Sequence, residues 1–245
     1  MKFHLLSDIH LENVNINYVK HLLMPTVTGD VCFLAGDICS TNQIEKYELF
    51  IKYLQEQFNE IVFVAGNHEF YGSSYNKTID ELVDLASRTK THFLDIETNQ
   101  HTIELYGKTI HGSTLWTDFN AGKNAKDVEN GINDYLAIKD ISTLKIREVH
   151  ERSRNAINWD ADIVMTHHMP ILREHSRFPL SPITYAFCCT DLEDSIINSD
   201  IKYWLYGHTH DNRFFDLNGT HVLSNHVGYD FYEIQMYNNE LTLYC

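Results

Sequence analysis

Two histidines lie one residue apart in the segment YGHTHD, residues 206–211. In a strand, residues two apart point to the same side, so the imidazoles of His208 and His210 could converge on one point. Neutral imidazole is a common metal ligand, and the arrangement therefore suggests a metal site. The alternative is a polar turn after a strand, because an isolated H-x-H pattern does not distinguish the two.

Polar clusters of the same kind end other short apolar runs of the chain. The clusters are Asp8 with His10, Asp37, Asn67 with His68, His167 with His168, and His208 with His210. The runs before them carry β-branched and aromatic residues without polar alternation, which is typical of strands buried on both faces. Ligands bind beyond the carboxyl ends of strands in open α/β sheets. We therefore expect the clusters to meet at one edge of a sheet.

The strands that would position these clusters alternate with predicted helices. The apolar runs span residues 2–8, 31–37, 61–67, 162–168 and 203–209. Residues 41–58 place apolar side chains at helical spacing, and a second helix is predicted over residues 76–90. Residues 101–116 alternate like a hairpin that turns at Gly107 and Lys108. This order of strands and helices predicts an α/β fold.

The remainder of the chain is predicted to complete a single domain over residues 1–245. Residues 118–160 are charged and rich in asparagine, and we interpret them as a helical insertion. Near the end, residues 213–225 and 229–245 contain Asn-Gly and Asn-Asn pairs between apolar stretches, a pattern that predicts paired strands. The sequence contains no visible repeat, low-complexity segment or interdomain linker.

The composition restricts the expected partners and location. The chain has 34 acidic and 19 basic residues and a net charge of −15, which disfavours duplex nucleic acid because its phosphates require Lys and Arg. Its five cysteines form no C-x-x-C pair, which argues against a disulfide framework and favours a reducing compartment. The first apolar stretch is broken by Ser7 and Asp8, and no later run is long enough for a membrane span. We expect a soluble cytoplasmic protein without a membrane partner; its oligomeric state stays open.

The polar clusters contain the donors of a two-metal site. Asp8 and His10 could bind a first ion, and Asp37 could bridge it to a second through both carboxylate oxygens. Asn67 and the remaining histidines could complete the set of ligands around the second ion. Mixed imidazole and oxygen donors favour Mn, Fe, Zn, Co or Ni over Mg or Ca, and the absence of cysteine argues against structural zinc. Each aspartate alone also fits a helix cap or a turn, but clusters after several similar strands favour the two-metal interpretation.

Taken together, the clusters resemble the signature of the calcineurin-like metallophosphoesterases. That signature is D-x-H, GD, GNH[DE], H and GHxH. In this chain it corresponds, in order, to DIH at residues 8–10, GD at 36–37, GNHE at 66–69, HH at 167–168 and GHTH at 207–210. The resemblance implies a four-layer α/β/β/α sandwich of two mixed sheets flanked by helices, with the site at the strand ends.

The resemblance also implies a role for each matched residue. One ion would be held by Asp8, His10, Asp37 and His210, and the other by Asp37, Asn67, His167 and His208. Either histidine of the THHMP segment could be the ligand, and His167 is preferred because it emerges first from the strand. His68 and Asp37 are the expected catalytic residues, and Glu69 is expected to orient a neighbour through a hydrogen bond. Substrate contacts are expected from Asn67, His68 and His168. They are also expected from His226, which belongs to no matched motif but follows the GHTH segment.

The activity implied is hydrolysis of phosphate esters. A hydroxide bridging two divalent or mixed-valence transition-metal ions would attack phosphorus in line, and a protonated His68 could assist the leaving oxygen. Two ions, the carboxylates of Asp8 and Asp37 and one hydroxide sum to a formal charge of about +1. This charge favours small phosphodiesters, cyclic nucleotides among them, slightly over dianionic monoesters. The alternatives are a phosphomonoesterase acting on nucleotides or phosphoproteins, and a non-catalytic scaffold on the same fold.

Overall fold

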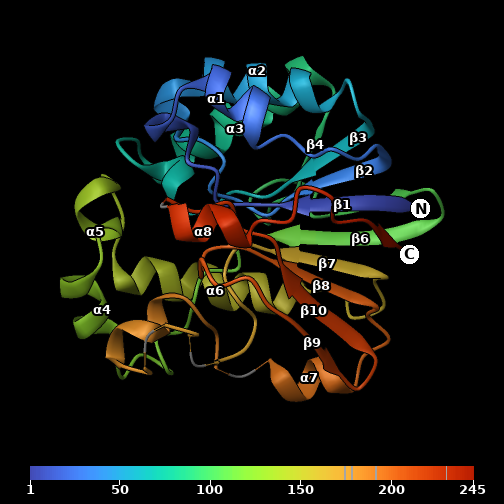
Figure 1. The fold of residues 1–245 in the computed structure, drawn as a ribbon. Helices are drawn as coiled ribbons and strands as arrows, with labels where there is room; N and C mark the ends of the chain where they lie inside the picture. Colours follow the sequence, from blue (N-terminus) through green and yellow to red (C-terminus); the bar gives the residue numbers. More distant parts are fainter. Residues whose placement is uncertain (174, 178, 191, 230) are drawn as a thin grey trace.

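Two β-sheets lie face to face with helices on the outer side of each. The computed structural model describes residues 1–173, 175–177, 179–190, 192–229 and 231–245. Figure 1 shows the layers in the order helices, sheet, sheet, helices. The predicted four-layer α/β/β/α sandwich of two mixed sheets is thereby confirmed.

The first sheet contains three of the predicted strands. In spatial order its strands are β11 (Leu243–Tyr244), β1 (Lys2–Leu6), β2 (Gly29–Leu34), β3 (Phe58–Phe63) and β4 (His92–Phe93). Strands β1 to β4 are parallel, and β11 pairs antiparallel with β1. The helices on its outer face are α1 (Ile16–Leu22), α2 (Ile44–Leu54) and α3 (Tyr75–Thr89). Both helices predicted from apolar spacing are therefore present as α2 and α3.

The second sheet contains the other two predicted strands and two hairpins. Its strands in spatial order are β5 (Thr102–Leu105), β6 (Lys108–Ser113), β7 (Ile163–Thr166), β8 (Tyr203–Tyr206), β10 (Thr220–Ser224) and β9 (Phe214–Leu217). Strands β6, β7, β8 and β10 run parallel, while β5 and β9 are antiparallel edges. The β9–β10 hairpin turns at Asn218 and Gly219, whose positive φ angles of 53° and 99° are the reason for the Asn-Gly pair. Helix α7 (Glu193–Ile197) lies on the outer side of this sheet (Figure 1).

Alternate strand residues form the core between the sheets. Phe3 and Leu5 of β1 face the second sheet, whereas Leu6 packs with the helices above the first. From the opposite side, Ile163 and Met165 of β7 meet this layer. All of these side chains are buried, so each sheet has an apolar covering on both faces and its strands read as continuous apolar runs.

The segment 118–160 forms helices beside the second sheet. They are α4 (Ala125–Gly131), α5 (Asp134–Ala137) and α6 (Thr143–Ala156). Gly131 at the end of α4 approaches Ile183 of the short helix η4 (Pro182–Ala186) so closely that a Cβ would not fit. The interpretation of this segment as an insertion in a single domain stays a prediction.

The end of the chain departs from the predicted strand pairing over residues 229–245. Residues Phe231–Met236 form a helix, α8, and only Leu243–Tyr244 add a strand to the first sheet. Ile234 and Tyr237, three residues apart, both pack against the first core cluster, which a strand could not achieve because it alternates its faces. The prediction of a strand over these residues is therefore wrong, because the apolar segment before the Asn-Asn pair forms a helix.

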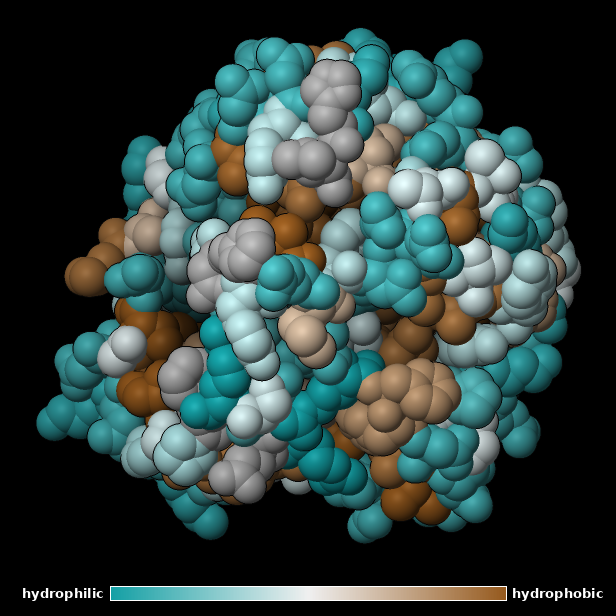
Figure 2. Space-filling model, in the orientation of Figure 1, coloured by the Kyte–Doolittle hydropathy of each residue, from teal (hydrophilic) through white to brown (hydrophobic). Residues whose placement is uncertain are grey.

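Hydrophilic side chains cover most of the face drawn in Figure 2, and apolar ones form separate patches between them. Within the part of the chain that the structure describes, no helix is both long and apolar enough to cross a lipid bilayer.

Candidate metal centre

The loops after β1, β2, β3, β7 and β8 meet at one edge of the molecule. All the side chains predicted as metal ligands come together there, each within 4.0 Å of another member of the set. They form two groups that we name the first group (Asp8, His10 and His210) and the second group (Asp37, Asn67, His167 and His208). Segments separated by up to 200 residues are therefore neighbours at the strand ends, as expected for an α/β fold.

Left-handed backbone conformations aim these side chains inward. Asp8, His10, Asp37, His208 and His210 have positive φ angles between 51° and 70°, a region that residues other than glycine rarely adopt. Backbone hydrogen bonds hold the loops against this strain, such as the one from the Asp8 N–H to the Gly36 carbonyl at 3.0 Å. Such strain clusters at functional sites when the surrounding structure maintains it.

Two glycines allow the loops to close around His167. A Cβ on Gly36 would lie 2.8 Å from Cγ of His167, and one on Gly207 would lie 2.9 Å from its Nδ1. Both distances are shorter than real Cβ contacts. The loops after β2 and β8 can therefore contact the imidazole only because these positions carry no side chain.

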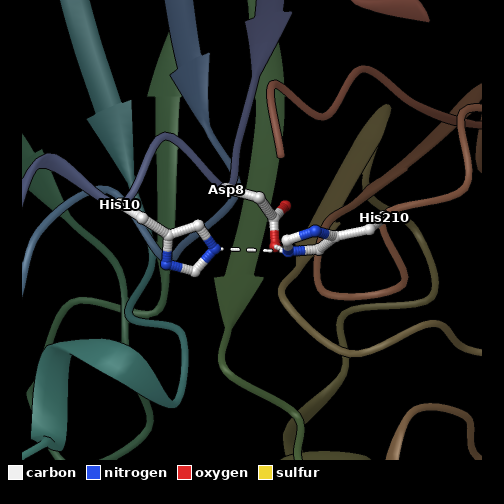
Figure 3. A group of neighbouring side chains, drawn as sticks. All are labelled: Asp8, His10 and His210. Atoms are coloured by element: carbon white, nitrogen blue, oxygen red, sulfur yellow. Dashed lines mark hydrogen bonds and ion pairs between the residues drawn. The ribbon is translucent and has the colours of Figure 1, made fainter. Parts of the chain in front are cut away.

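The first group is drawn in Figure 3. Nε2 of His10 lies 3.2 Å from Nε2 of His210, which in turn lies 3.3 Å from a carboxylate oxygen of Asp8. Carboxylates face the other ring nitrogens: Nδ1 of His210 lies 2.9 Å from Glu233, and Nδ1 of His10 lies 3.4 Å from Glu12. A hydrogen bond at Nδ1 leaves the lone pair of Nε2 directed into the group, which is the arrangement of a metal-binding histidine.

The second group surrounds Nε2 of His167. This atom lies 3.1 Å from Oδ1 of Asn67, 3.1 Å from Nδ1 of His208 and 3.5 Å from Oδ1 of Asp37. Nδ1 of His167 lies 2.7 Å from the carbonyl of Ala35 and is therefore the protonated ring nitrogen when the imidazole is neutral. All four side chains are buried.

Asp37 lies between the two groups. One carboxylate oxygen, Oδ2, is 4.0 Å from Nε2 of His10, and the other, Oδ1, is 3.5 Å from Nε2 of His167. A single carboxylate therefore faces both sets of donors. Imidazole nitrogens, carboxylates and one amide oxygen fit two transition-metal ions such as Mn, Fe, Zn, Co or Ni, and this donor set does not select one of them.

The pKa values show that the centre attracts positive charge. Burial alone would raise the pKa of Asp37, but the imidazoles of His167 and His68 lower it well below its usual range. Burial opposes a proton on His167, yet the carboxylates of Asp37 and Asp8 raise its pKa to about 9. Burial lowers the pKa of His208 well below 6.5, so this ligand stays neutral. The buried carboxylates thus need cations near them, which bound metal ions would supply.

Glu69 fixes the backbone beneath the centre. Its buried carboxylate accepts hydrogen bonds from the N–H groups of Asp37 at 2.9 Å, Ile38 at 2.8 Å and Gly66 at 2.6 Å. Burial and the neighbouring charge of Asp37 raise the pKa of Glu69 to about 7. The expected hydrogen bonding of Glu69 to its neighbours is present, and the donors are backbone N–H groups of the GD and GN loops.

His68 lies beside the first group. Its Nδ1 is 3.1 Å from Glu12, and its Nε2 is 2.9 Å from the hydroxyl of Tyr229. Burial would lower the pKa of His68, but the carboxylates of Asp37 and Glu12 raise it above its usual value. The ring stacks on Tyr71 with centroids 4.1 Å apart and lines the cavity described below. It is therefore placed to meet a substrate, and with His10 and Glu12 it also forms a cluster that could hold a metal ion.

His168 and His226 lie behind the ligand side chains. Nδ1 of His168 is 3.2 Å from the carbonyl of Thr114, and its ring centroid is 4.3 Å from that of His208. Nε2 of His226 is 3.7 Å from Asp8. Among the described residues, neither lines the main cavity. Substrate contact by these two histidines stays a prediction, and their positions suit support of His208 and Asp8 instead.

A cavity of about 750 Å³ opens beside the second group and His210. Its walls include apolar side chains of the η4 region and the α4–α5 connection, and several arginines. These wall residues are Ile132, Met169, Ile183, Phe187, Arg173, Arg177 and Arg213. The centre is thus joined to a chamber large enough for a small organic molecule.

Sequence reasoning missed several carboxylates and tyrosines of this site. They are Glu12, Tyr71, Asp134, Tyr229 and Glu233. Glu12 follows His10 by two residues, and this spacing could have suggested it. Asp134, Tyr229 and Glu233 belong to no motif, since only the folded chain brings them to the centre.

Comparison with known proteins identifies the class of this fold and site. The profile of the calcineurin-like phosphoesterases matches residues 1–212. The arrangement is that of a metal-dependent phosphoester hydrolase. The chain belongs to the calcineurin-like phosphoesterase family.

Individual proteins resemble this chain at low sequence identity. Uncharacterized protein L509 of Acanthamoeba polyphaga mimivirus is 29% identical over 256 residues, which cover 91% of this chain and 89% of that protein. The crystal structure of phosphopantetheinyl hydrolase from Mycobacterium tuberculosis matches with a TM-score of 0.73 and 18% identity, covering 93% of this chain and 89% of that one. A putative 5′-nucleotidase from Staphylococcus aureus matches with a TM-score of 0.45 and 15% identity, covering 91% of this chain and 48% of that one.

Proposed function

We propose that the protein hydrolyses small phosphate esters with two bound divalent ions and prefers phosphodiesters to phosphomonoesters. The observation that carries this proposal is the carboxylate of Asp37, which faces His10 with one oxygen and His167 with the other. Shared carboxylates of this kind bridge the ions of two-metal hydrolases.

Each ion has its own set of ligands in this proposal. The first is held by Asp8, His10, Asp37 and His210, and the second by Asp37, Asn67, His167 and His208. Two such ions supply Lewis-acid activation of water and offset the negative charge of the phosphate oxygens. Manganese suits this donor set and is the ion to use in tests.

His68 would act on the leaving group. Glu12 holds Nδ1 at 3.1 Å, which fixes the ring and leaves Nε2 facing the cavity side of the centre. Burial would lower the pKa of His68, but the carboxylates of Asp37 and Glu12 raise it above its usual value and so favour a proton on the ring. His68 can therefore donate this proton to the oxygen that departs from phosphorus. The Tyr229 hydroxyl, 2.9 Å from Nε2, marks a position that such an oxygen could take.

The charge around the centre supports a monoanionic substrate. Besides Asp8 and Asp37, the carboxylates of Glu12 and Glu233 lie within hydrogen-bond distance of site histidines, and Asp134 contacts Asn67. Each added negative charge repels a dianionic monoester more strongly than a monoanionic diester. The balance of charge therefore favours phosphodiesters, cyclic nucleotides among them.

The cavity supports a small-molecule substrate. Its volume of about 750 Å³ falls in the usual range for small ligands, and its apolar residues would contact an organic leaving group.

The competing function is a phosphomonoesterase, for example on nucleotides, and the arginines of the wall favour it. Arg173 and Arg213 each lie 2.6 Å from a carboxylate, Glu193 and Asp211, which offsets their positive charge.

The test compares two aryl esters on protein that is freed of metal with a chelator and reloaded with Mn²⁺. We expect kcat/KM for bis(p-nitrophenyl) phosphate to exceed that for p-nitrophenyl phosphate by about tenfold, a difference of ~1.4 kcal/mol in transition-state stabilisation. A higher value for the monoester would replace the proposal by the monoesterase. No hydrolysis of either ester by protein that holds two ions would leave only a scaffold role.

A wider panel follows from the same reasoning. Cyclic nucleotides belong in it as small diesters, and a phosphopantetheinyl compound belongs in it because of the fold shared with the mycobacterial hydrolase.

The location is proposed from the cysteines. They form no C-x-x-C pair in the sequence, and four of the five are buried. This pattern supports the proposal that the protein works in a reducing compartment such as the cytoplasm.

A further inference from the structure

Asp134 is a buried carboxylate at the edge of the centre that no motif of the sequence indicates. It is the first residue of α5 (Asp134–Ala137), and its exposed fraction is 5%. It lines the cavity together with Asn67 and Tyr71. A carboxylate so deeply buried must be satisfied by donors or by a cation, because burial otherwise disfavours its charge.

The donors of Asp134 are a candidate metal ligand and a tyrosine. Its Oδ1 accepts a hydrogen bond from Nδ2 of Asn67 at 2.8 Å and another from the hydroxyl of Tyr71 at 2.7 Å. Burial raises the pKa of Asp134, whereas these two hydrogen bonds stabilise its charged form. Tyr71 thus holds the carboxylate in place from a second side.

The contact with Asn67 settles the orientation of its amide. Nδ2 of Asn67 donates a hydrogen bond to Oδ1 of Asp134, so the NH₂ end of the amide faces the carboxyl group. The carbonyl end, Oδ1, is then turned toward the second group, where it lies 3.1 Å from Nε2 of His167. In the flipped orientation the amide nitrogen, which is not a metal ligand, would point into the group, and two oxygens would face each other at Asp134.

We propose that Asp134 is a positioning residue of the second group, which holds the amide oxygen of Asn67 in the orientation required to bind an ion. Helix α5 is then a structural part of the metal centre, although it lies outside the strand ends that carry the ligands. The inference rests on the proposed function, since it assumes that the second group binds an ion.

The experiment measures binding of Mn²⁺ to the metal-free protein by isothermal titration, with electron paramagnetic resonance reporting coupled and isolated ions. The variants are Asp134→Ala, which removes the acceptor, and Asp134→Asn, which keeps one acceptor oxygen. Asp127→Ala is the matched control because Asp127 is an exposed aspartate of α4. We expect Asp134→Ala to lower the affinity for one Mn²⁺ ion by about 10- to 100-fold and to leave the affinity for the other unchanged. The resonance spectrum should then show isolated Mn²⁺ in place of the coupled pair. Asp134→Asn should restore both ions.

A second variant keeps the proposal testable if Asp134→Ala does not fold, which circular dichroism of the metal-free protein would show. Tyr71→Phe retains the ring and removes one donor to Asp134, and we expect a smaller weakening of the same ion. Three results would overturn the proposal. Asp134→Ala could bind both Mn²⁺ ions with the affinities of Asp127→Ala, or Asp134→Asn could bind Mn²⁺ as weakly as Asp134→Ala. The third is a Tyr71→Phe variant with wild-type affinity for both ions.

The same titration separates this inference from the proposed function. Wild-type protein that takes up two Mn²⁺ ions but hydrolyses no phosphate ester would contradict the proposed function and leave the role of Asp134 to be decided by its variants. Wild-type protein that binds fewer than two ions would contradict both. If every variant binds two ions and is fully active, the role of Asp134 is contradicted and the proposed function is not.

Discussion

The two groups of the proposed metal centre are held in different ways. In the second group, His167 is fully buried and its Nδ1 lies 2.7 Å from the backbone carbonyl of Ala35, at the end of β2. In the first group, the side chain of His210 is 14% exposed and its Nδ1 faces the carboxylate of Glu233 on α8. One anchor is part of the sheet, and the other is a side chain from a helix beyond the region that the family profile matches.

This difference predicts unequal metal binding. A backbone carbonyl at a strand end is fixed by the ladder of the sheet, so no additional side chain has to be ordered when an ion binds. The carboxylates of Glu12 and Glu233 must adopt one rotamer to hold their histidines, which costs conformational entropy. We therefore expect the second group to bind its ion more tightly than the first.

The largest effect is expected from Asp37→Ala, because one carboxylate oxygen of Asp37 faces His10 of the first group and the other faces His167 of the second. Both ions should be lost and kcat/KM should fall by more than about 10³-fold, since the catalytic unit no longer forms. Elemental analysis of the purified variant and ester hydrolysis measure the two consequences. Retention of either ion at wild-type affinity would show that the groups are independent and that no carboxylate is shared.

The next effect separates metal binding from chemistry. His68→Ala should leave both ions bound, because His68 belongs to neither group, and should reduce kcat by about 10²- to 10⁴-fold through loss of the proton donor. Metal content and kcat are measured on the same preparation. If this variant loses an ion, His68 is a ligand and the division into two groups must be redrawn.

A smaller effect should be confined to the first group. Glu233→Gln keeps the size of the side chain but removes the charge that faces His210, and we expect the affinity of one ion to fall by about tenfold. Mn²⁺ titration measures both affinities, and Glu129→Gln on the exposed side of α4 is the control. An equal loss of affinity for both ions would contradict the difference between the two groups, because it would mean that they are not anchored separately.

The smallest effect uses a buried histidine outside the centre as a reference. Among the described residues, His4 forms hydrogen bonds with the carbonyl of Leu241 and the hydroxyl of Tyr237, and burial lowers its pKa to about 4 from 6.5. The folded state therefore disfavours its proton: its contribution to stability is complete above pH 6.5 and is lost as the pH falls toward 4. At pH 5 the free energy of unfolding lost in this way is roughly 2 kcal/mol.

Urea unfolding of the metal-free protein tests this prediction. Between pH 7.5 and pH 5, His4→Gln should lose less stability than the wild type. An equal loss in both proteins would show that His4 does not cause it.

The strands and the ligand positions could be predicted because their signals are local. The run from Val31 to Asp37 carries its apolar residues, its glycine and its carboxylate in seven consecutive positions. The parallel arrangement of such strands then requires their ends to share an edge. For the same reason, the helix at Tyr75–Thr89 and the Asn-Gly hairpin were predictable from short segments.

The remaining contacts could not be predicted because they depend on tertiary structure. Asn67 and Asp134 are 67 residues apart, and nothing in the sequence near Asp134 distinguishes it from other acidic residues of the segment. Glu233 lies in a stretch for which the Asn-Asn pair and its apolar neighbours predicted a strand, which would have placed its side chain differently from the helix that forms. Carboxylates that support a metal ligand leave no pattern of their own in a single sequence.

The most direct test of the account is anomalous diffraction from a crystal grown with Mn²⁺. We predict two peaks about 3.5 to 4 Å apart, with one oxygen of Asp37 bound to each ion. A single peak, or two peaks of which only one is bound by Asp37, would contradict the shared carboxylate.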